Sequence, residues 1–194
     1  MIQKPFYFLR HGETEWNIKR RWQGKSDIPL NDKGVAQAQA VRPHLEGLGI
    51  KAIYSSPLQR AKTTATLASA GLDIPIHTLD DLQEVSFGPY EGANHYEVDW
   101  MQDWLKGGHV EGVEGYNAFI ERCRGAINQA LSYDGSVLIV AHGGVFWSVR
   151  HYGQLDPNLR AWNCSLFHLQ PPKGDHPGWL HSALNEDQTA PIGG

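Results

Sequence analysis

The stretch VLIVAHGG, residues 137–144, decides how the rest of the chain is interpreted. Its first five residues are apolar and mostly β-branched, a run that is typical of a strand buried on both faces of a parallel sheet. His142 follows this run directly, with two glycines next, and a helix is predicted over residues 145–152. A buried strand that leads into a histidine and then a helix indicates a site at the carboxyl end of the strand.

The start of the chain shows the same pattern. Residues 6–9, FYFL, predict a second short buried strand. Arg10 and His11 follow it, and the next residue is again a glycine. The strand end at His11 therefore repeats the strand end at His142.

A second arginine is predicted close to these two strand ends. A third short strand, over residues 52–54, ends in two serines before Pro57. Because proline is favoured in the first turn of a helix, we expect Arg60 to lie at the start of a helix. Two guanidiniums and two imidazoles could then converge on a phosphoryl group, since guanidinium forks match phosphate oxygens and glycines allow close backbone approach.

The remaining pattern predicts an α/β fold with three layers, in which a mainly parallel central sheet is flanked by helices. Further helices are predicted over residues 31–48, 96–105 and 116–131, and further strands over residues 74–78, 165–169 and, weakly, 179–184. The chain has no internal repeat or linker, so a single domain over residues 1–194 is expected. A small helical cap is predicted from about residues 90–115, and a flexible tail after residue 185.

Composition narrows the class of protein. The 194 residues are 41% hydrophobic and 20% charged, as expected for a soluble globular protein. A net charge of −4 without a basic run gives no reason to expect nucleic acid or an anionic membrane as a partner. The two cysteines, Cys123 and Cys164, form no disulfide framework or CxxC motif, and no signal-peptide core or membrane-spanning run is present. These features predict a cytoplasmic protein.

Several separated motifs resemble the histidine phosphatase superfamily, also called the phosphoglycerate mutase-like family. They appear in the family's order over nearly the whole chain: RHGET at residues 10–14, WN at 16–17, QGKSDIPL at 23–30, SPLQRA at 56–61, Glu84 ahead of FGPYEG at 87–92, and AHGG at 141–144. Agreement among so many motifs is far more specific than one short pattern. The end of the chain departs from the family, which often has an Asn and a His-Leu pair after a late strand.

The resemblance implies a role for each matching residue. His11 attacks phosphorus and forms a phosphohistidine, and Glu84 donates a proton to the leaving oxygen and later activates water. The substrate phosphate and its surroundings are bound by Arg10, Asn17, Gln23, Gly24, Arg60, His142 and Gly143. No metal and no cofactor is implied, because the cationic side chains offset the charge of the transition state.

Other residues compete for some of these roles. Glu13, Asp80, Asp81 and Glu91 are alternatives to Glu84 as the proton donor. Trp16, Trp22 and Tyr90 suit either an apolar substrate wall or the core, whereas Trp100 and Trp104 are expected in the core. The other eight histidines show no metal-binding spacing and are assigned no role; they are His44, His77, His95, His109, His151, His168, His176 and His181.

The leading functional prediction is a histidine acid phosphatase-type phosphoric monoester hydrolase that acts on a small phosphorylated metabolite, with a homodimer allowed. Phosphoglycerate mutase is the alternative within the family. Mutases of that type typically carry Glu-Arg-His-Tyr-Gly after the catalytic Glu, but here the run from Glu84 reads EVSFGPYEG, which lacks the cationic residues. A binding module that lost its chemistry is a third hypothesis, disfavoured by the retained histidines and arginines.

Overall fold

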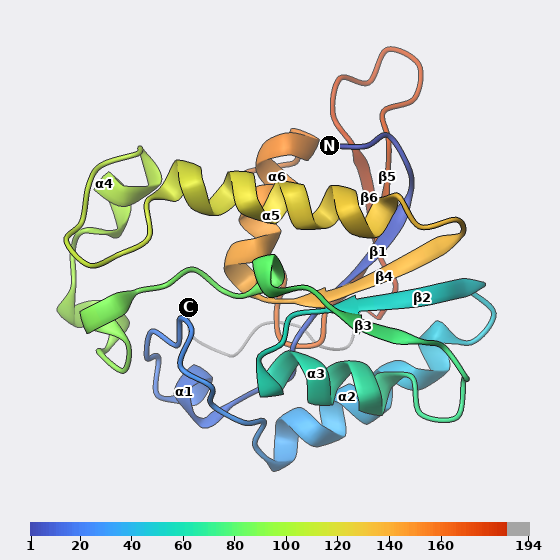
Figure 1. The fold of residues 1–194 in the computed structure, drawn as a ribbon, viewed down its shortest axis with the longest axis horizontal. Helices are drawn as coiled ribbons and strands as arrows, with labels where there is room; N and C mark the ends of the chain where they lie inside the picture. Colours follow the sequence, from blue (N-terminus) through green and yellow to red (C-terminus); the bar gives the residue numbers. More distant parts are fainter. Residues whose placement is uncertain (186–194) are drawn as a thin grey trace.

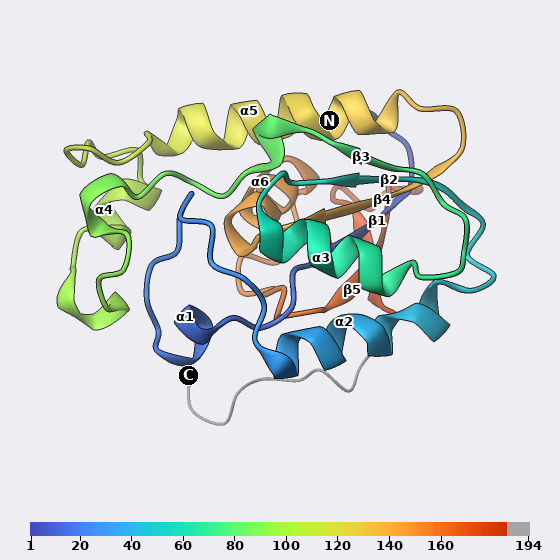
Figure 2. The same cartoon turned by 60° about the horizontal axis from the view of Figure 1, so that its bottom comes forward.

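The computed structural model describes residues 1–185, in which a six-stranded sheet lies between two layers of helices (Figures 1 and 2). The strand order across the sheet is β3-β2-β4-β1-β5-β6. The strands are β1 (Phe6–Arg10), β2 (Ile50–Ser55), β3 (Ile76–Thr78), β4 (Ser136–Ala141), β5 (Leu166–Gln170) and β6 (Leu180–Ala183). The predicted three-layer α/β fold is confirmed.

The sheet is mixed, with a parallel majority. β3, β2, β4 and β1 run parallel to one another, whereas β5 pairs with β1, and β6 with β5, in the antiparallel sense. The loop before β5 stays at the carboxyl end of β1, where the Cys164 amide donates to the Arg10 carbonyl at 3.0 Å. Because β5 starts where β1 ends, it must run back along it.

The two faces of the sheet are covered by different helix pairs. Alternate residues of β1 show this: Phe6 and Phe8 lie in the cluster packed against α5 (Tyr116–Leu131) and α6 (Gly143–Gly153), whereas Leu9 lies in the cluster with α2 (Asp32–Leu45) and α3 (Gln59–Ala68). Strands in the middle of the sheet therefore have two apolar faces, which explains the continuous apolar run in β4.

The short elements between β3 and α5 differ from the prediction. They are the 3₁₀ helices η1 (Asp80–Leu82), η2 (Gly88–Tyr90) and η3 (His95–Glu97), and the helix α4 (Met101–Leu105). One helix over residues 96–105 was the wrong prediction, because the chain is extended at Val98, with φ −131° and ψ 135°. Near the N-terminus, a capping box between Thr14 and Asn17 forms α1 (Glu15–Ile18), which periodicity does not predict.

Several element boundaries also differ, and three examples follow. α2 ends at Leu45 instead of residue 48, because Glu46 is extended and Gly47 has a φ of +78°. β3 begins at Ile76 instead of residue 74. α6 begins at Gly143, two residues earlier than predicted, directly after His142 as its N-cap.

At the end of the described chain, Asn185 is buried and bonds to the backbone beside β5, accepting from Leu166 and donating to Cys164. The predicted flexible tail after residue 185 lies outside the described residues. Within residues 1–185, no helix combines the length and the apolar character needed to cross a membrane.

Candidate active site

The carboxyl ends of the four parallel strands bring the predicted site residues to one edge of the sheet. Arg10 is the last residue of β1 and His11 follows it. His142 follows β4, and Arg60 is the second residue of α3 after β2. Glu84 comes after β3 and η1. The convergence expected from strand polarity is therefore present in the structure.

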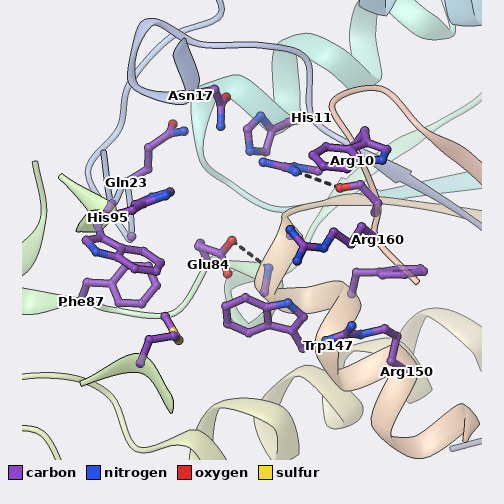
Figure 3. Close-up of a pocket in the computed structure, with 18 of the residues that line it drawn as sticks. Arg10, His11, Asn17, Gln23, Glu84, Phe87, His95, Trp147, Arg150 and Arg160 are labelled. Carbon is purple, nitrogen blue, oxygen red and sulfur yellow. Dashed lines mark hydrogen bonds between the residues drawn. The ribbon is translucent and has the colours of Figure 1, made fainter. Parts of the chain in front are cut away.

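A cavity of about 640 Å³ opens at this edge of the sheet (Figure 3). Eight of the predicted residues line it, namely Arg10, His11, Asn17, Gln23, Gly24, Arg60, Glu84 and Gly143. The ninth, His142, is fully buried beside the cavity, and its ring centroid lies 5.2 Å from that of His11. We call Arg10, His11, Arg60 and His142 the floor of the cavity.

His11 is held in a defined tautomer. Its Nδ1 lies 2.7 Å from the Gly12 carbonyl oxygen, which can only accept, so Nδ1 carries the proton and Nε2 carries the lone pair. Burial, followed by the charges of Arg60 and Arg10, holds the pKa of His11 well below 6.5. His11 is therefore a neutral imidazole with Nε2 as its basic nitrogen.

His142 is neutral for the same reasons. Burial, followed by the charge of Arg60, lowers its pKa well below 6.5. Its Nε2 lies 2.8 Å from the Ser56 hydroxyl, and that hydroxyl also accepts from the Leu58 amide at 3.3 Å. The Ser56 hydroxyl can either donate to Nε2 or accept from it, so both neutral tautomers of His142 fit this contact. The His142 Nδ1 has no hydrogen-bond partner within residues 1–185.

The two floor arginines are tied down by backbone carbonyls. Arg60 donates to Gly24 and Ser26, both at 2.8 Å, and Arg10 donates to Ala161 at 2.8 Å. Burial lowers the pKa of Arg60 to about 10, so it stays charged at neutral pH. The Nε of each arginine is buried without a partner in the described chain. Buried cations of this kind are stabilised by an anion.

Glu84 is the only carboxylate among the described residues that line the cavity. Its two oxygens accept from the backbone amides of Val85 and Gly144, each at 3.0 Å. A β-carbon at position 144 would collide with the Glu84 carboxylate, so the glycine is needed for this approach.

None of the four competing carboxylates lines the cavity, and two of them bind partners elsewhere. Glu13 binds Asn31 and Lys33 outside the cavity. Glu91 accepts from the amides of Lys25 and Ser26 and so shapes the loop that Arg60 also holds. A side chain at Gly24 would collide with Glu91, and Gly24 has a φ of +51°.

Asn17 and Gln23 present amides to the cavity. The Asn17 Oδ1 accepts from the Thr14 amide at 3.0 Å, which leaves its Nδ2 directed toward the cavity (Figure 3). The Gln23 Oε1 is buried without a partner in the described chain. Of the five aromatic residues weighed as a wall, Trp22 lines the cavity, and Trp104 is fully buried in the core as expected.

Sequence reasoning missed part of the lining. Trp147 and Arg150 lie four and seven residues after Gly143 on α6, a helical spacing that places all three on one face and that could have revealed them. Arg160 and His95 also line the cavity, although His95 was assigned no role. Arg160 comes from a loop and His95 from the three-residue 3₁₀ helix η3, and neither segment carries a periodic signal.

Comparisons with known proteins agree with this geometry. Residues 6–179 match the model of the histidine phosphatase superfamily (branch 1), and the chain belongs to this superfamily. It is 34% identical over 150 residues to the adenosylcobalamin/alpha-ribazole phosphatase of Salmonella typhimurium, covering 72% of this chain and 74% of that protein. It is 35% identical over 147 residues to the probable phosphoglycerate mutase GpmB of Cronobacter sakazakii, covering 71% and 68%.

A solved structure supports the fold. Bacillus stearothermophilus YhfR superimposes with a TM-score of 0.78 at 26% identity, covering 96% of this chain and 98% of that one. Within residues 1–185, no three His, Cys, Asp or Glu side chains gather in an arrangement that could hold a metal ion.

Proposed function

We propose that this chain is a metal-independent phosphomonoester hydrolase that acts on a small phosphorylated metabolite through a phosphohistidine intermediate. The observation that carries the proposal is the state of His11. It is a neutral imidazole whose Nδ1 is fixed by the Gly12 carbonyl, and it lines the cavity together with Arg10 and Arg60, whose charges act on it. A neutral, oriented imidazole beside an anion site is suited to nucleophilic attack on a phosphate.

In the first step, His11 Nε2 forms a bond to phosphorus while the bond from phosphorus to the ester oxygen breaks. Glu84, in its protonated form, gives its proton to that oxygen, so the alcohol leaves neutral. The products are the free alcohol, phospho-His11 and the Glu84 carboxylate.

The floor stabilises the charge that builds up on the transferred group. Arg10 and Arg60 meet the equatorial oxygens, and the unpartnered Nε atoms add donors on the same side chains. In the tautomer that accepts from Ser56, His142 carries its proton on Nδ1, and this N–H and the Asn17 amide are further neutral donors. Donors fixed before the reaction lose little energy to reorganisation when the transition state forms.

In the second step, water attacks the phosphorus of phospho-His11. Glu84 takes a proton from that water, the bond from nitrogen to phosphorus breaks, and inorganic phosphate leaves. His11 returns to the neutral imidazole and Glu84 to the protonated acid, so the cycle is closed.

Phosphoglycerate mutase is the second candidate, because several relatives carry the name of a probable mutase. The two reactions share the first step and differ in whether the phosphoryl group passes to water or returns to a substrate hydroxyl. Release of inorganic phosphate at the rate of substrate loss supports hydrolysis, whereas an isomeric phosphate product without released phosphate supports the mutase. Cytoplasmic location and a homodimer stay predictions.

The test is His11→Ala. We expect turnover of every phosphomonoester to be lost while the circular dichroism spectrum and melting temperature stay close to wild type. Rapid quenching of the wild type with a radiolabelled substrate should trap acid-labile, base-stable phosphate on His11, and a metal chelator should have little effect. His44→Ala, at an exposed position on α2, is the matched control and should behave as wild type. Wild-type-like turnover by His11→Ala would overturn the mechanism.

A further inference from the structure

The cavity carries more positive charge than one phosphate group needs. Five arginines line it, at positions 10, 21, 60, 150 and 160, against the single carboxylate of Glu84 among the described residues. A phosphomonoester brings at most two negative charges, and the two floor arginines already face them. The surplus is local, because the whole chain has a net charge of −4.

Two of the remaining arginines lie together on one side of the cavity. Arg150 and Arg160 line the side opposite Gln23 and Phe87, and the Arg160 guanidinium points into the cavity (Figure 3). Neither forms an ion pair with a carboxylate in the part of the chain that the structure describes. We call Trp147, Arg150 and Arg160 the outer wall of the cavity.

The positive charges of Arg150 and Arg160 repel each other. Burial is the main cause that lowers the pKa of Arg150, and the charge of Arg160 lowers it further, whereas Tyr116 and Asp156 act in the other direction. The Arg150 Nε is buried and has no partner within residues 1–185. An anion between the two guanidiniums would relieve their repulsion and supply the missing partner.

A purely structural role explains Arg150 but not Arg160. Arg150 donates to the backbone carbonyls of Pro157 and Leu159, so it holds the loop that carries Arg160. Arg160 itself is exposed, with its Cζ 6.0 Å from the centre of the Trp162 ring. Exposed and directed into the cavity, the Arg160 guanidinium is free to meet a ligand.

We propose that Arg160, positioned by Arg150, binds a second anionic group on the alcohol part of the substrate. The substrate class is then a phosphomonoester that also carries a carboxylate or a second phosphate. This inference rests on the proposed function and narrows it, because an uncharged sugar phosphate or alkyl phosphate would leave the outer wall without its partner.

The experiment compares substrates that differ in the second group. Glycerol 3-phosphate and 3-phosphoglycerate are matched in size and differ by one carboxylate; ribose 5-phosphate and ribose 1,5-bisphosphate differ by one phosphate. We expect wild type to prefer the anionic member of at least one pair in kcat/KM, and the pair that shows the preference identifies the group. In Arg160→Gln that preference should fall by about tenfold to hundredfold, the range of a charge-assisted hydrogen bond.

Arg42→Gln removes an equal charge from α2, away from the cavity, and should keep the wild-type preference. Equal loss for both members of each pair in Arg160→Gln, or no preference in wild type, would overturn the inference while the phosphatase proposal stands. If wild type turns over no phosphomonoester, the proposed function fails. In that case, calorimetric measurement of how tightly the same pairs bind to the wild-type and Arg160→Gln proteins still tests whether Arg160 binds the second anionic group.

Discussion

The floor and the outer wall of the cavity are built differently. The floor residues stand at strand ends and in a first helical turn, and Arg10, His11 and Arg60 are each held by backbone carbonyls. The outer wall comes from the middle and end of α6 and from the loop after it, and Arg160 is exposed there. The floor thus suits a phosphate group in one fixed position, whereas the wall suits selection among substrates, because loops vary more freely than strand ends.

Glu84 allows a test between the two regions, because its proposed role is to protonate the leaving oxygen beside the floor of the cavity. Glu84→Gln keeps the size of the side chain but cannot donate a proton. With an alkyl phosphate, we expect the rate to fall by about 10²–10⁴-fold, the usual contribution of general acid catalysis. With p-nitrophenyl phosphate the loss should be smaller, since nitrophenolate leaves without much protonation.

Glu13→Gln is the control for this experiment, because Glu13 was the competing carboxylate and its side chain binds Asn31 and Lys33 outside the cavity. Steady-state rates on both substrates should stay near wild type. Equal losses on both substrates in Glu84→Gln, or a leaving-group effect in Glu13→Gln instead, would reassign the proton donor.

The difference between the floor and the outer wall also explains which site residues can be predicted from the sequence and which cannot. Strand polarity and short motifs placed Arg10, His11, Arg60 and His142 at one edge of the sheet, because a strand end fixes the direction of the next residue. Arg160 was missed, since its position depends on Arg150 binding two loop carbonyls, which is a tertiary contact without a local signal.

Helix boundaries failed where local geometry competed with periodicity. The break at Val98 follows a 3₁₀ turn capped by Asn94, and apolar spacing alone cannot reveal it. Trp147 is an intermediate case: the helix beginning at Gly143 determines its face, so that residue could have been predicted once the helix start was known.

Arg122 holds the segment that carries Glu84, the proposed proton donor. It donates to the backbone carbonyls of Asp81, Gln83 and Glu84 at 2.8–3.0 Å, and it forms a two-point ion pair with Glu114 at 2.6 and 2.8 Å. Arg122→Met should release this segment and lower kcat on an alkyl phosphate by about tenfold, because a loss near 1.4 kcal/mol is expected from misplacing one charge-assisted bond.

Arg122 is a positioning residue, so the leaving-group dependence is its diagnostic. The loss in Arg122→Met should be smaller with p-nitrophenyl phosphate, as in Glu84→Gln, and the two variants together should lose little more than Glu84→Gln alone. Arg124→Met, on the exposed side of α5, is the matched control. A lower melting temperature with equal losses on both substrates would show that Arg122 supports only the fold.

The smallest expected effect concerns the pH dependence of the free energy of unfolding. The buried floor histidines should contribute to this dependence, whereas an exposed histidine should not. Both His11 and His142 have pKa values well below 6.5 in the folded protein, chiefly because of burial. In the unfolded chain, an imidazole takes up a proton near pH 6.5. Below that pH the unfolded state therefore binds more protons than the folded state, so the free energy of unfolding should decrease as the pH falls. Above that pH the contribution of the two histidines to stability is fully retained.

Each buried neutral histidine adds up to about 1.4 kcal/mol per pH unit to this slope, the value for one proton. His142→Asn should therefore show a shallower decline than wild type when urea unfolding is measured from about pH 7 to about pH 5. The comparison of slopes is independent of any constant loss of stability that the substitution causes. His44→Ala, at an exposed position, should keep the wild-type slope. If His142→Asn kept it too, His142 would be protonated in the folded protein, and its proposed role as a neutral donor on the floor would have to be replaced by that of a cation.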